Sequence, residues 1–125
     1  MRRILPLAVV LAIGVAGTAI SAPLIAIDPG HGGADSGAVG VLPSGTATGL
    51  TPRTDADGQT VIYEKDVTLD VSQRLDVFLK ARGFPTLMTR TQDLAGGDLP
   101  FTTVGADLKA RTDAANAANA RLFVS

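Results

Sequence analysis

The sequence contains no cysteine and no tryptophan, and it is poor in aromatic residues. Without cysteine the chain cannot form a disulfide, a thiolate nucleophile or a sulfur-ligated metal site. Any metal bound by its side chains must therefore be held by imidazole and carboxylate groups. Aromatic residues make up 4% of the chain and the formal net charge is −1, so stacking platforms for bases and a basic face for phosphates are both lacking. We expect no nucleic-acid partner.

Histidine and glutamate are almost as scarce as cysteine. His31 is the only histidine and Glu64 is the only glutamate, because every other acidic residue is aspartate. Chemistry that requires an imidazole or a glutamate carboxylate therefore has a single place in this chain.

Residues 1–22 have the layout of a secretory signal peptide. Two arginines precede an almost unbroken apolar run from Ile4 to Val15, and small residues follow it. Cleavage after Ser21 or Ala22 would leave residues 23–125 as one folded domain. An uncleaved membrane anchor needs about 20 apolar residues, and the length of this run is marginal for that. A buried core helix would show a polar stripe, which this run lacks. We therefore expect export to the periplasm, cell envelope or exterior, with no stable membrane span after cleavage.

The rest of the chain alternates strand and helix signals. Short apolar runs next to turn signals predict strands at Leu24–Ile27, Phe84–Thr89 and Leu122–Val124. The stretch from Gly30 to Gln59 is rich in glycine and polar residues, and it is predicted as a loop. This order predicts an α/β fold, a three-layer sandwich with a mostly parallel twisted sheet flanked by helices. Because the chain stops directly after the third strand, we expect an N-terminal portion of such a domain, truncated after about three strands.

Two helices are predicted between these strands. The first has apolar residues at helical spacing, with Asp66 as its N-cap or first-turn acid and Gly83 beyond its end. The second runs from Asp107 to Ala120 and is rich in alanine. The side chains expected to face the core are Val67, Val71, Leu75, Phe78 and Leu79 on the first helix, and Leu108, Ala115 and Ala118 on the second.

The turn Asp28-Pro29-Gly30-His31-Gly32-Gly33 follows the first predicted strand directly. In parallel α/β sheets the working groups lie beyond the carboxyl ends of the strands. A neutral imidazole there is a natural metal ligand, and we expect the Asp28 carboxylate to fix its tautomer. A surface histidine in a flexible turn and a phosphate-binding glycine loop are the alternatives. The glycine loop is disfavoured because Asp35 stands where the nucleotide fingerprint requires glycine or alanine.

Glu64 stands just before the first predicted helix. It could act as a first-turn acid stabilised by the helix dipole, an effect of roughly 0.3–1 kcal/mol. Asp66 already suits that role, however, and the apolar run Val61-Ile62-Tyr63 leads directly into the Glu64 carboxylate. Zinc held by histidine and glutamate with an open water position is a recurring hydrolytic arrangement. His31 and Glu64 are therefore the candidate metal ligands.

Several segments form an ordered set of motifs along the chain. They are Ile25-Ala26-Ile27-Asp28-Pro29-Gly30-His31-Gly32-Gly33, Asp35-Ser36-Gly37-Ala38, Tyr63-Glu64-Lys65-Asp66-Val67, Arg82-Gly83, Met88-Thr89-Arg90, Leu108, Arg111, Ala118-Asn119 and Leu122-Phe123-Val124-Ser125. With these motifs the chain resembles the zinc-dependent N-acetylmuramoyl-L-alanine amidases of bacterial cell-wall turnover. The resemblance covers essentially the whole chain after the signal peptide, although the stretch Val41–Gln59 is longer and more polar than the usual connection.

The resemblance implies zinc as the cofactor and peptidoglycan as the partner. The implied reaction is hydrolysis of the amide between N-acetylmuramic acid and L-alanine, with His31 as the first zinc ligand and Glu64 as the second. In the family a third ligand, a histidine, follows the strand that ends here at Val124-Ser125, and a catalytic glutamate lies further on. The general base is therefore expected beyond Ser125, no catalytic residue is assigned within this chain, and the 125 residues alone are expected to be inactive.

Three other hypotheses remain open from the sequence. Glu64 could be the general base, which would leave His31 as the only ligand. The chain could be a non-catalytic cell-wall-binding or regulatory module with the amidase fold. It could also be an unrelated α/β domain with an incidental Asp-Pro-Gly-His turn, in which case a His31→Ala change would leave zinc affinity unaltered. Arg111 and Asn119 match the family pattern, and we expect structural roles for them.

Overall fold

The computed structural model describes residues 21–43, 46 and 49–125. The predicted signal peptide falls almost entirely on residues 1–20, outside the described residues. In the described part of the chain, no helix combines the length and the apolar character needed to cross a membrane.

The central sheet has three parallel strands, in the order β5-β1-β6. Strand β1 (Ile25–Ile27) pairs with β5 (Thr86–Met88) on one side and with β6 (Leu122–Val124) on the other. All three strands lie where the apolar runs predict them, and the α/β prediction is confirmed. The three residues of β1 are between 0% and 7% exposed because both neighbouring strands and both helices surround this strand. The carboxyl end of β1 leads straight into the turn that carries His31.

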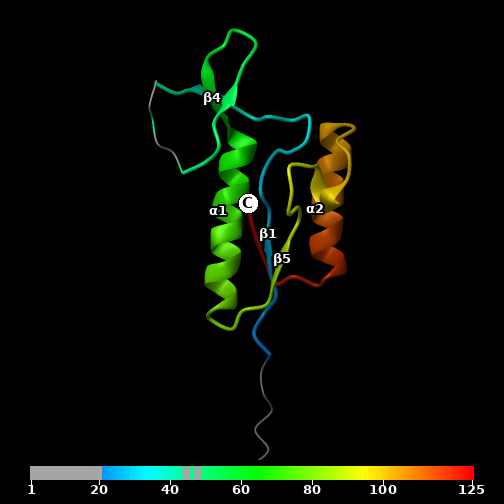
Figure 1. Cartoon of the computed structure of the whole chain (residues 1–125). Coiled ribbons are helices and arrows are strands. Elements are labelled where there is room, and N and C mark those ends of the chain that lie inside the picture. Colours follow the sequence, from blue (N-terminus) through cyan, green and yellow to red (C-terminus); the bar gives the residue numbers. More distant parts are fainter. Residues whose placement is uncertain (1–20, 44–45, 47–48) are drawn as a thin grey trace, which may run out of the picture.

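Two helices flank this sheet, and in Figure 1 the strands β1 and β5 run between them. Helix α1 (Glu64–Lys80) begins after an extended Tyr63, so Asp66 lies in its first turn and is not the N-cap. Helix α2 (Val104–Ala117) begins three residues before the predicted start. The cause is Thr103, whose side chain accepts a hydrogen bond from the Ala106 amide and caps the helix there.

The predicted inward faces of the helices are partly wrong. Leu75, Leu79 and Ala118 are half-buried and Ala115 is buried, as predicted, but the other four residues are exposed. On α1, Val67, Val71 and Phe78 are 37%, 57% and 50% exposed, and the buried positions are Lys65 and Ser72. On α2, Leu108 is exposed, and Asp107, Arg111 and Ala115 face inward. The prediction fails because the interior at the carboxyl edge of the sheet is polar. Charged side chains that have hydrogen-bond or ion-pair partners inside the protein are buried on these helices, and hydrophobic periodicity does not predict their burial.

The predicted loop from Gly30 to Gln59 contains two short strands. Strand β2 (Val39–Val41) and strand β3 (Arg53–Thr54) pair antiparallel with β4 (Thr60–Tyr63), in the order β2-β4-β3. Figure 1 places this small sheet beyond the N-terminal end of α1. These two strands were not predicted because neither is a continuous apolar run: Gly40 interrupts β2, which is exposed, and β3 consists of Arg53 and Thr54.

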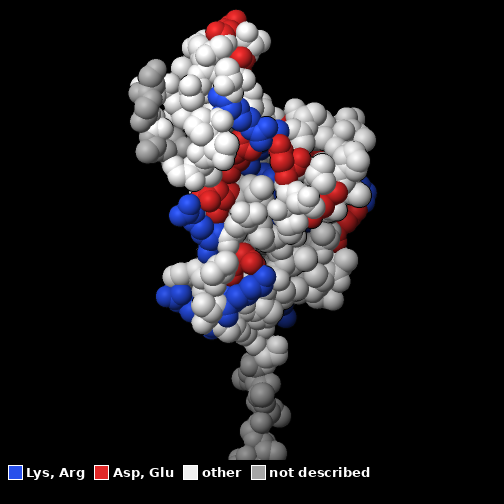
Figure 2. Space-filling view, viewed as in Figure 1, with Lys and Arg blue, Asp and Glu red and all other residues white. Residues whose placement is uncertain are grey.

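Side-chain charges of both signs alternate over the face of the molecule seen in Figure 2, and no large patch of one sign forms there. Part of this alternation comes from pairs four residues apart on the helices: Arg74–Asp70, Lys80–Asp76 and Lys109–Asp113. Exposed pairs of this kind contribute about 0.3–0.5 kcal/mol each, so they affect solubility more than they stabilise the fold.

Candidate metal centre at the carboxyl edge of the sheet

His31 sits on a tight turn with an unusual backbone. Its φ is +59°, and Gly32 and Gly33 follow with φ of +136° and +59°. Two backbone hydrogen bonds between Gly32 and Asp35, of 2.9 and 3.1 Å, close the turn. A Cβ on Gly32 would lie 2.1 Å from the Leu94 carbonyl oxygen, so this position requires glycine. The turn folds Asp35 back toward the ring of His31.

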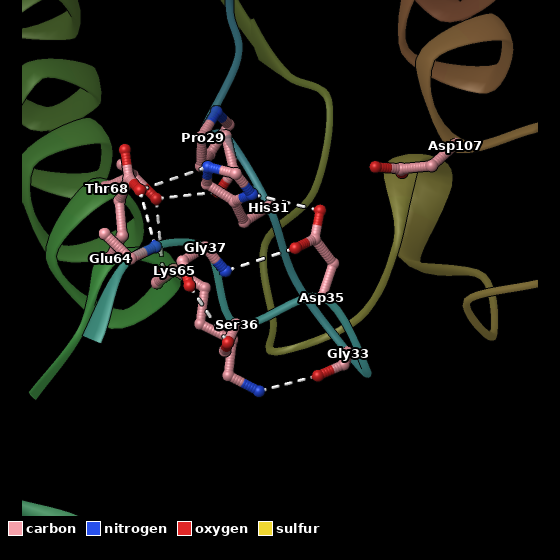
Figure 3. Close-up of polar contacts among 12 residues, drawn as sticks. Pro29, His31, Gly33, Asp35, Ser36, Gly37, Glu64, Lys65, Thr68 and Asp107 are labelled. Carbon is pink, nitrogen blue, oxygen red and sulfur yellow. Dashed lines mark hydrogen bonds and ion pairs between the residues drawn. The ribbon is translucent and has the colours of Figure 1, made fainter. Parts of the chain in front are cut away.

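The imidazole of His31 lies between two carboxylates (Figure 3). Its Nδ1 is 3.0 Å from Oδ2 of Asp35, and its Nε2 is 3.3 Å from Oε2 of Glu64. The hydrogen bond with His31 lowers the pKa of Asp35 below its ordinary value, despite the opposing effect of burial. The other Asp35 oxygen accepts a hydrogen bond from the Gly37 amide. Asp35 is thus held as an acceptor for His31. In the tautomer that carries its proton on Nδ1, the Nε2 lone pair would be directed at Glu64.

Asp28 does not hold the imidazole, contrary to the prediction from the sequence. Its carboxylate accepts hydrogen bonds from the Thr89 hydroxyl, from Nη1 of Arg111 at 2.8 Å, and from the Ser125 hydroxyl at 3.2 Å. Asp28 continues β1 and points into the interior, whereas the left-handed backbone at His31 turns the imidazole toward α1. Asp35, four residues after His31, takes the predicted role. A sequence signal for it existed, since glycines on both sides of His31 allow a tight reversal at this point.

Glu64 is placed by the start of α1. The amides of Glu64 and Lys65 donate to the carbonyls of Ala38 and Ser36, at 2.9 and 3.2 Å, so the loop satisfies the first helical turn without a side-chain cap. In return, Oε2 of Glu64 accepts a hydrogen bond of 2.9 Å from the Ala38 amide. The Glu64 carboxylate is therefore not used as a helix cap and faces His31.

The separation between these two side chains fits a shared metal ion. Ligand atoms placed roughly 2.0–2.2 Å from zinc on tetrahedral directions lie about 3.3–3.5 Å apart. The distance from Nε2 of His31 to Oε2 of Glu64 is 3.3 Å. With the proton on Nδ1, both atoms present lone pairs, and a cation between them would satisfy both. Within the described residues, no group of three or more histidine, cysteine, aspartate or glutamate side chains could hold a metal, so a metal bound at this pair would have two side-chain ligands from the described part of the chain.

Gly37 lies against both candidate ligands. A Cβ at this position would lie 2.6 Å from Cδ2 of His31 and 2.8 Å from Oε2 of Glu64. We expect Gly37→Ala to push the two side chains apart and to lower zinc affinity about 10–100-fold, the range seen when groups that orient metal ligands are lost. Isothermal titration of zinc into the purified protein measures this effect.

The matched control for that substitution is Gly58→Ala. Gly58 has a φ of +75°, close to the +62° of Gly37, but a Cβ there meets nothing within 4 Å. Both variants therefore carry the same backbone strain, and only Gly37→Ala adds the collision. Equal zinc affinities in the two variants would contradict the assignment of this pair as ligands.

A groove of about 420 Å³ opens beside the two candidate ligands. His31 and Glu64 lie in its wall, together with the exposed Val67 and Val71, the half-buried Leu75 and the end of β6. Part of the apolar face of α1 therefore lines this groove.

Two buried arginines that the sequence did not single out as site residues hold the turn that carries His31. Arg90 and Arg111 are 1% and 2% exposed and are the largest fully buried side chains. Arg111 donates to the carbonyls of Pro29 and His31 as well as to Asp28, in agreement with its expected structural role. Arginine in a strand end or a helix gives no sequence signal of burial, because most arginines in such positions are exposed.

Comparisons with known proteins point to one family. A family model described as N-acetylmuramoyl-L-alanine amidase matches residues 25–125. The germination-specific N-acetylmuramoyl-L-alanine amidase of Bacillus subtilis (strain 168) is 35% identical over 113 residues, which cover 85% of this chain and 38% of that protein. The chain thus spans less than half the length of this curated relative.

Solved structures with the same fold carry similar descriptions. N-acetylmuramoyl-L-alanine amidase AmiC2 of Nostoc punctiforme is 30% identical with a TM-score of 0.51, over 81% of this chain and 41% of that chain. The CwlD amidase from Clostridioides difficile, solved in complex with the GerS lipoprotein, is 26% identical with a TM-score of 0.55, over 81% and 45%.

Proposed function

Because this chain belongs to the N-acetylmuramoyl-L-alanine amidase family, we propose that it forms the first part of a zinc-dependent peptidoglycan hydrolase. The bond cleaved is the amide between the lactyl group of N-acetylmuramic acid and L-alanine. The observation that carries the proposal is the 3.3 Å separation of His31 Nε2 and Glu64 Oε2 at the carboxyl edge of the sheet. The remaining ligand and the general base are expected outside the described residues.

In this proposal each residue of the site has a defined task. His31 and Glu64 hold the metal through Nε2 and Oε2, and Asp35 keeps the proton on Nδ1 of His31. Zinc bound there supplies Lewis-acid polarisation of the substrate carbonyl and activation of a water molecule. The Ala38 amide fixes the Oε2 atom of Glu64, so the carboxylate does not need to reorient on binding. Since both side chains are ligands, neither is free to act as the base.

We also propose that the protein is exported and acts in the cell envelope. Two features support this: the substrate is outside the cytoplasmic membrane, and residues 1–22 have the layout of a signal peptide. Peptidoglycan is the proposed partner. A neighbour of this fold was solved with a lipoprotein, but no described surface here is assigned to such a partner.

The test of this function is the chemistry of the products released from purified peptidoglycan by the whole protein in the presence of zinc. Cleavage of the lactyl–alanine amide frees the α-amino group of L-alanine, which dinitrophenylation detects, and it creates no new reducing sugar. Removal of zinc with a chelator should stop the release, and added zinc should restore it. For the 125 residues alone we expect no release, because they provide two ligands and no assigned base.

Other products would contradict the proposal. New reducing ends would indicate a glycosidase, and free amino groups of other residues would indicate an endopeptidase. Binding of the zinc-loaded whole protein to peptidoglycan without any release would favour the non-catalytic wall-binding module.

A further inference from the structure

Arg90 follows β5 and lies entirely inside the molecule, 1% exposed. Its guanidinium donates hydrogen bonds to four backbone carbonyls: Nε to Pro29 at 2.9 Å, Nη1 to Gln92 at 2.8 Å, and Nη2 to Gly30 and Lys65 at 2.9 Å each. Burial lowers the pKa of Arg90 below its ordinary value, and repulsion from Arg111 acts in the same direction. These hydrogen bonds all go to neutral carbonyls, an arrangement that is costly for a buried charge.

Three of the four carbonyls that Arg90 contacts, those of Pro29, Gly30 and Lys65, come from the two segments that carry the candidate ligands. Gly30 directly precedes His31, and Lys65 directly follows Glu64. A single nitrogen, Nη2, is shared between these two carbonyls at equal distances. The guanidinium therefore connects the turn after β1 to the first turn of α1, two segments that are more than 30 residues apart in the sequence.

We propose that Arg90 is a positioning residue that sets the spacing between His31 and Glu64 before a metal binds. This inference rests on the proposed metal role of the two side chains. The rigid fork of arginine, with five donors in one plane, can reach all four carbonyls at once. A lysine in its place would present one ammonium group, which cannot span the Pro29, Gly30, Gln92 and Lys65 carbonyls together.

Arg90 differs in this respect from Arg111. Arg111 forms ion pairs with Asp28 and Asp107, so its removal leaves two buried carboxylates without a counter-charge. Arg90 links backbone to backbone across the two segments. Two side chains of α1 also reach the turn: Nζ of Lys65 donates to the Gly33 carbonyl, and the Thr68 hydroxyl donates to the Gly30 carbonyl at 2.8 Å. Loss of Arg90 removes a donor that the Gly30 and Lys65 carbonyls share, so it should loosen the ligand spacing.

The test compares Arg90→Lys with Ile25→Ala, a variant that loses buried side chain at the opposite end of β1, away from the turn. Two quantities are measured on folded protein: zinc affinity by competition with a chromophoric chelator, and the nuclear Overhauser effect between the His31 ring and the Glu64 side chain without metal. His31 is the only histidine, so its ring signals need no assignment by mutation. We expect Arg90→Lys to lower zinc affinity at least about 10-fold and to weaken the Overhauser effect. Ile25→Ala should lower the melting temperature and leave both the zinc affinity and the Overhauser effect unchanged.

Each outcome decides the matter. If Arg90→Lys lowers the melting temperature as Ile25→Ala does but keeps zinc affinity and the Overhauser effect, Arg90 is merely structural and the inference is overturned. If Arg90→Lys does not fold, Arg90→Gln, which keeps one amide donor group, is measured in the same way. If the unmodified protein binds no zinc, the proposed function fails, while the Overhauser comparison still decides whether Arg90 sets the spacing.

Discussion

Replacement of His31 by asparagine is expected to lower zinc affinity by more than about 100-fold and to abolish amide hydrolysis by the whole protein. Loss of groups that merely orient ligands costs about 10–100-fold in affinity, so loss of a ligand should cost more. No second histidine and no cysteine can substitute for it. Asparagine is chosen because it tolerates the left-handed backbone at this position better than alanine, which separates metal loss from backbone strain.

Glu64→Gln tests the second ligand with almost no change of shape. An amide oxygen is a poorer zinc ligand than a carboxylate, so we expect a large loss of affinity here too. Asp70→Asn is the matched control, because it removes a charge from the same helix, where Asp70 pairs with the exposed Arg74. Zinc affinity that is unchanged in His31→Asn or in Glu64→Gln would contradict the assignment of that side chain.

Replacement of Arg111 by methionine is expected to lower the free energy of unfolding by about 3–5 kcal/mol, the usual cost of breaking a buried ion pair by removing one partner. Arg111 is 2% exposed and its guanidinium pairs with Asp28 at 2.8 Å and with Asp107 at 3.0 Å. Methionine fills a similar volume but leaves both carboxylates buried without a counter-charge. It also removes the donor to the His31 carbonyl, so the turn with the left-handed backbone loses support. Urea denaturation followed by circular dichroism measures the change.

Lys109→Met on the same helix is the control. Lys109 pairs with Asp113 four residues on, and the two side chains are 74% and 59% exposed. Exposed pairs of this kind contribute at most about 1 kcal/mol, so this variant should unfold nearly as the unmodified chain does. A similar small loss in Arg111→Met would mean that the buried ion pairs are dispensable, and that the turn is held by other contacts.

The parallel sheet and the identity of the two candidate ligands followed from local features of the sequence. The three strands are short apolar runs next to turn residues, and the central one, β1, is buried between its two neighbours. His31 and Glu64 stood out because the chain has one of each residue type, and because His31 follows a strand at the edge where α/β proteins place functional groups. These inferences required only the order of residues along the chain.

The partner of the imidazole, the inward faces of the helices and the link between the ligand segments depended on contacts between distant residues. Asp35, and not the predicted Asp28, lies beside His31 because the left-handed turn reverses the chain. The Asp28 carboxylate instead accepts a hydrogen bond from Arg111, 83 residues away. Arg90 reaches Gly30 across 60 residues, and a pattern based on hydrophobicity assigns such a side chain to the surface. Sequence periodicity reflects the preference of each residue for water. Whether a charged side chain is buried depends instead on whether the fold brings enough hydrogen-bond partners to it.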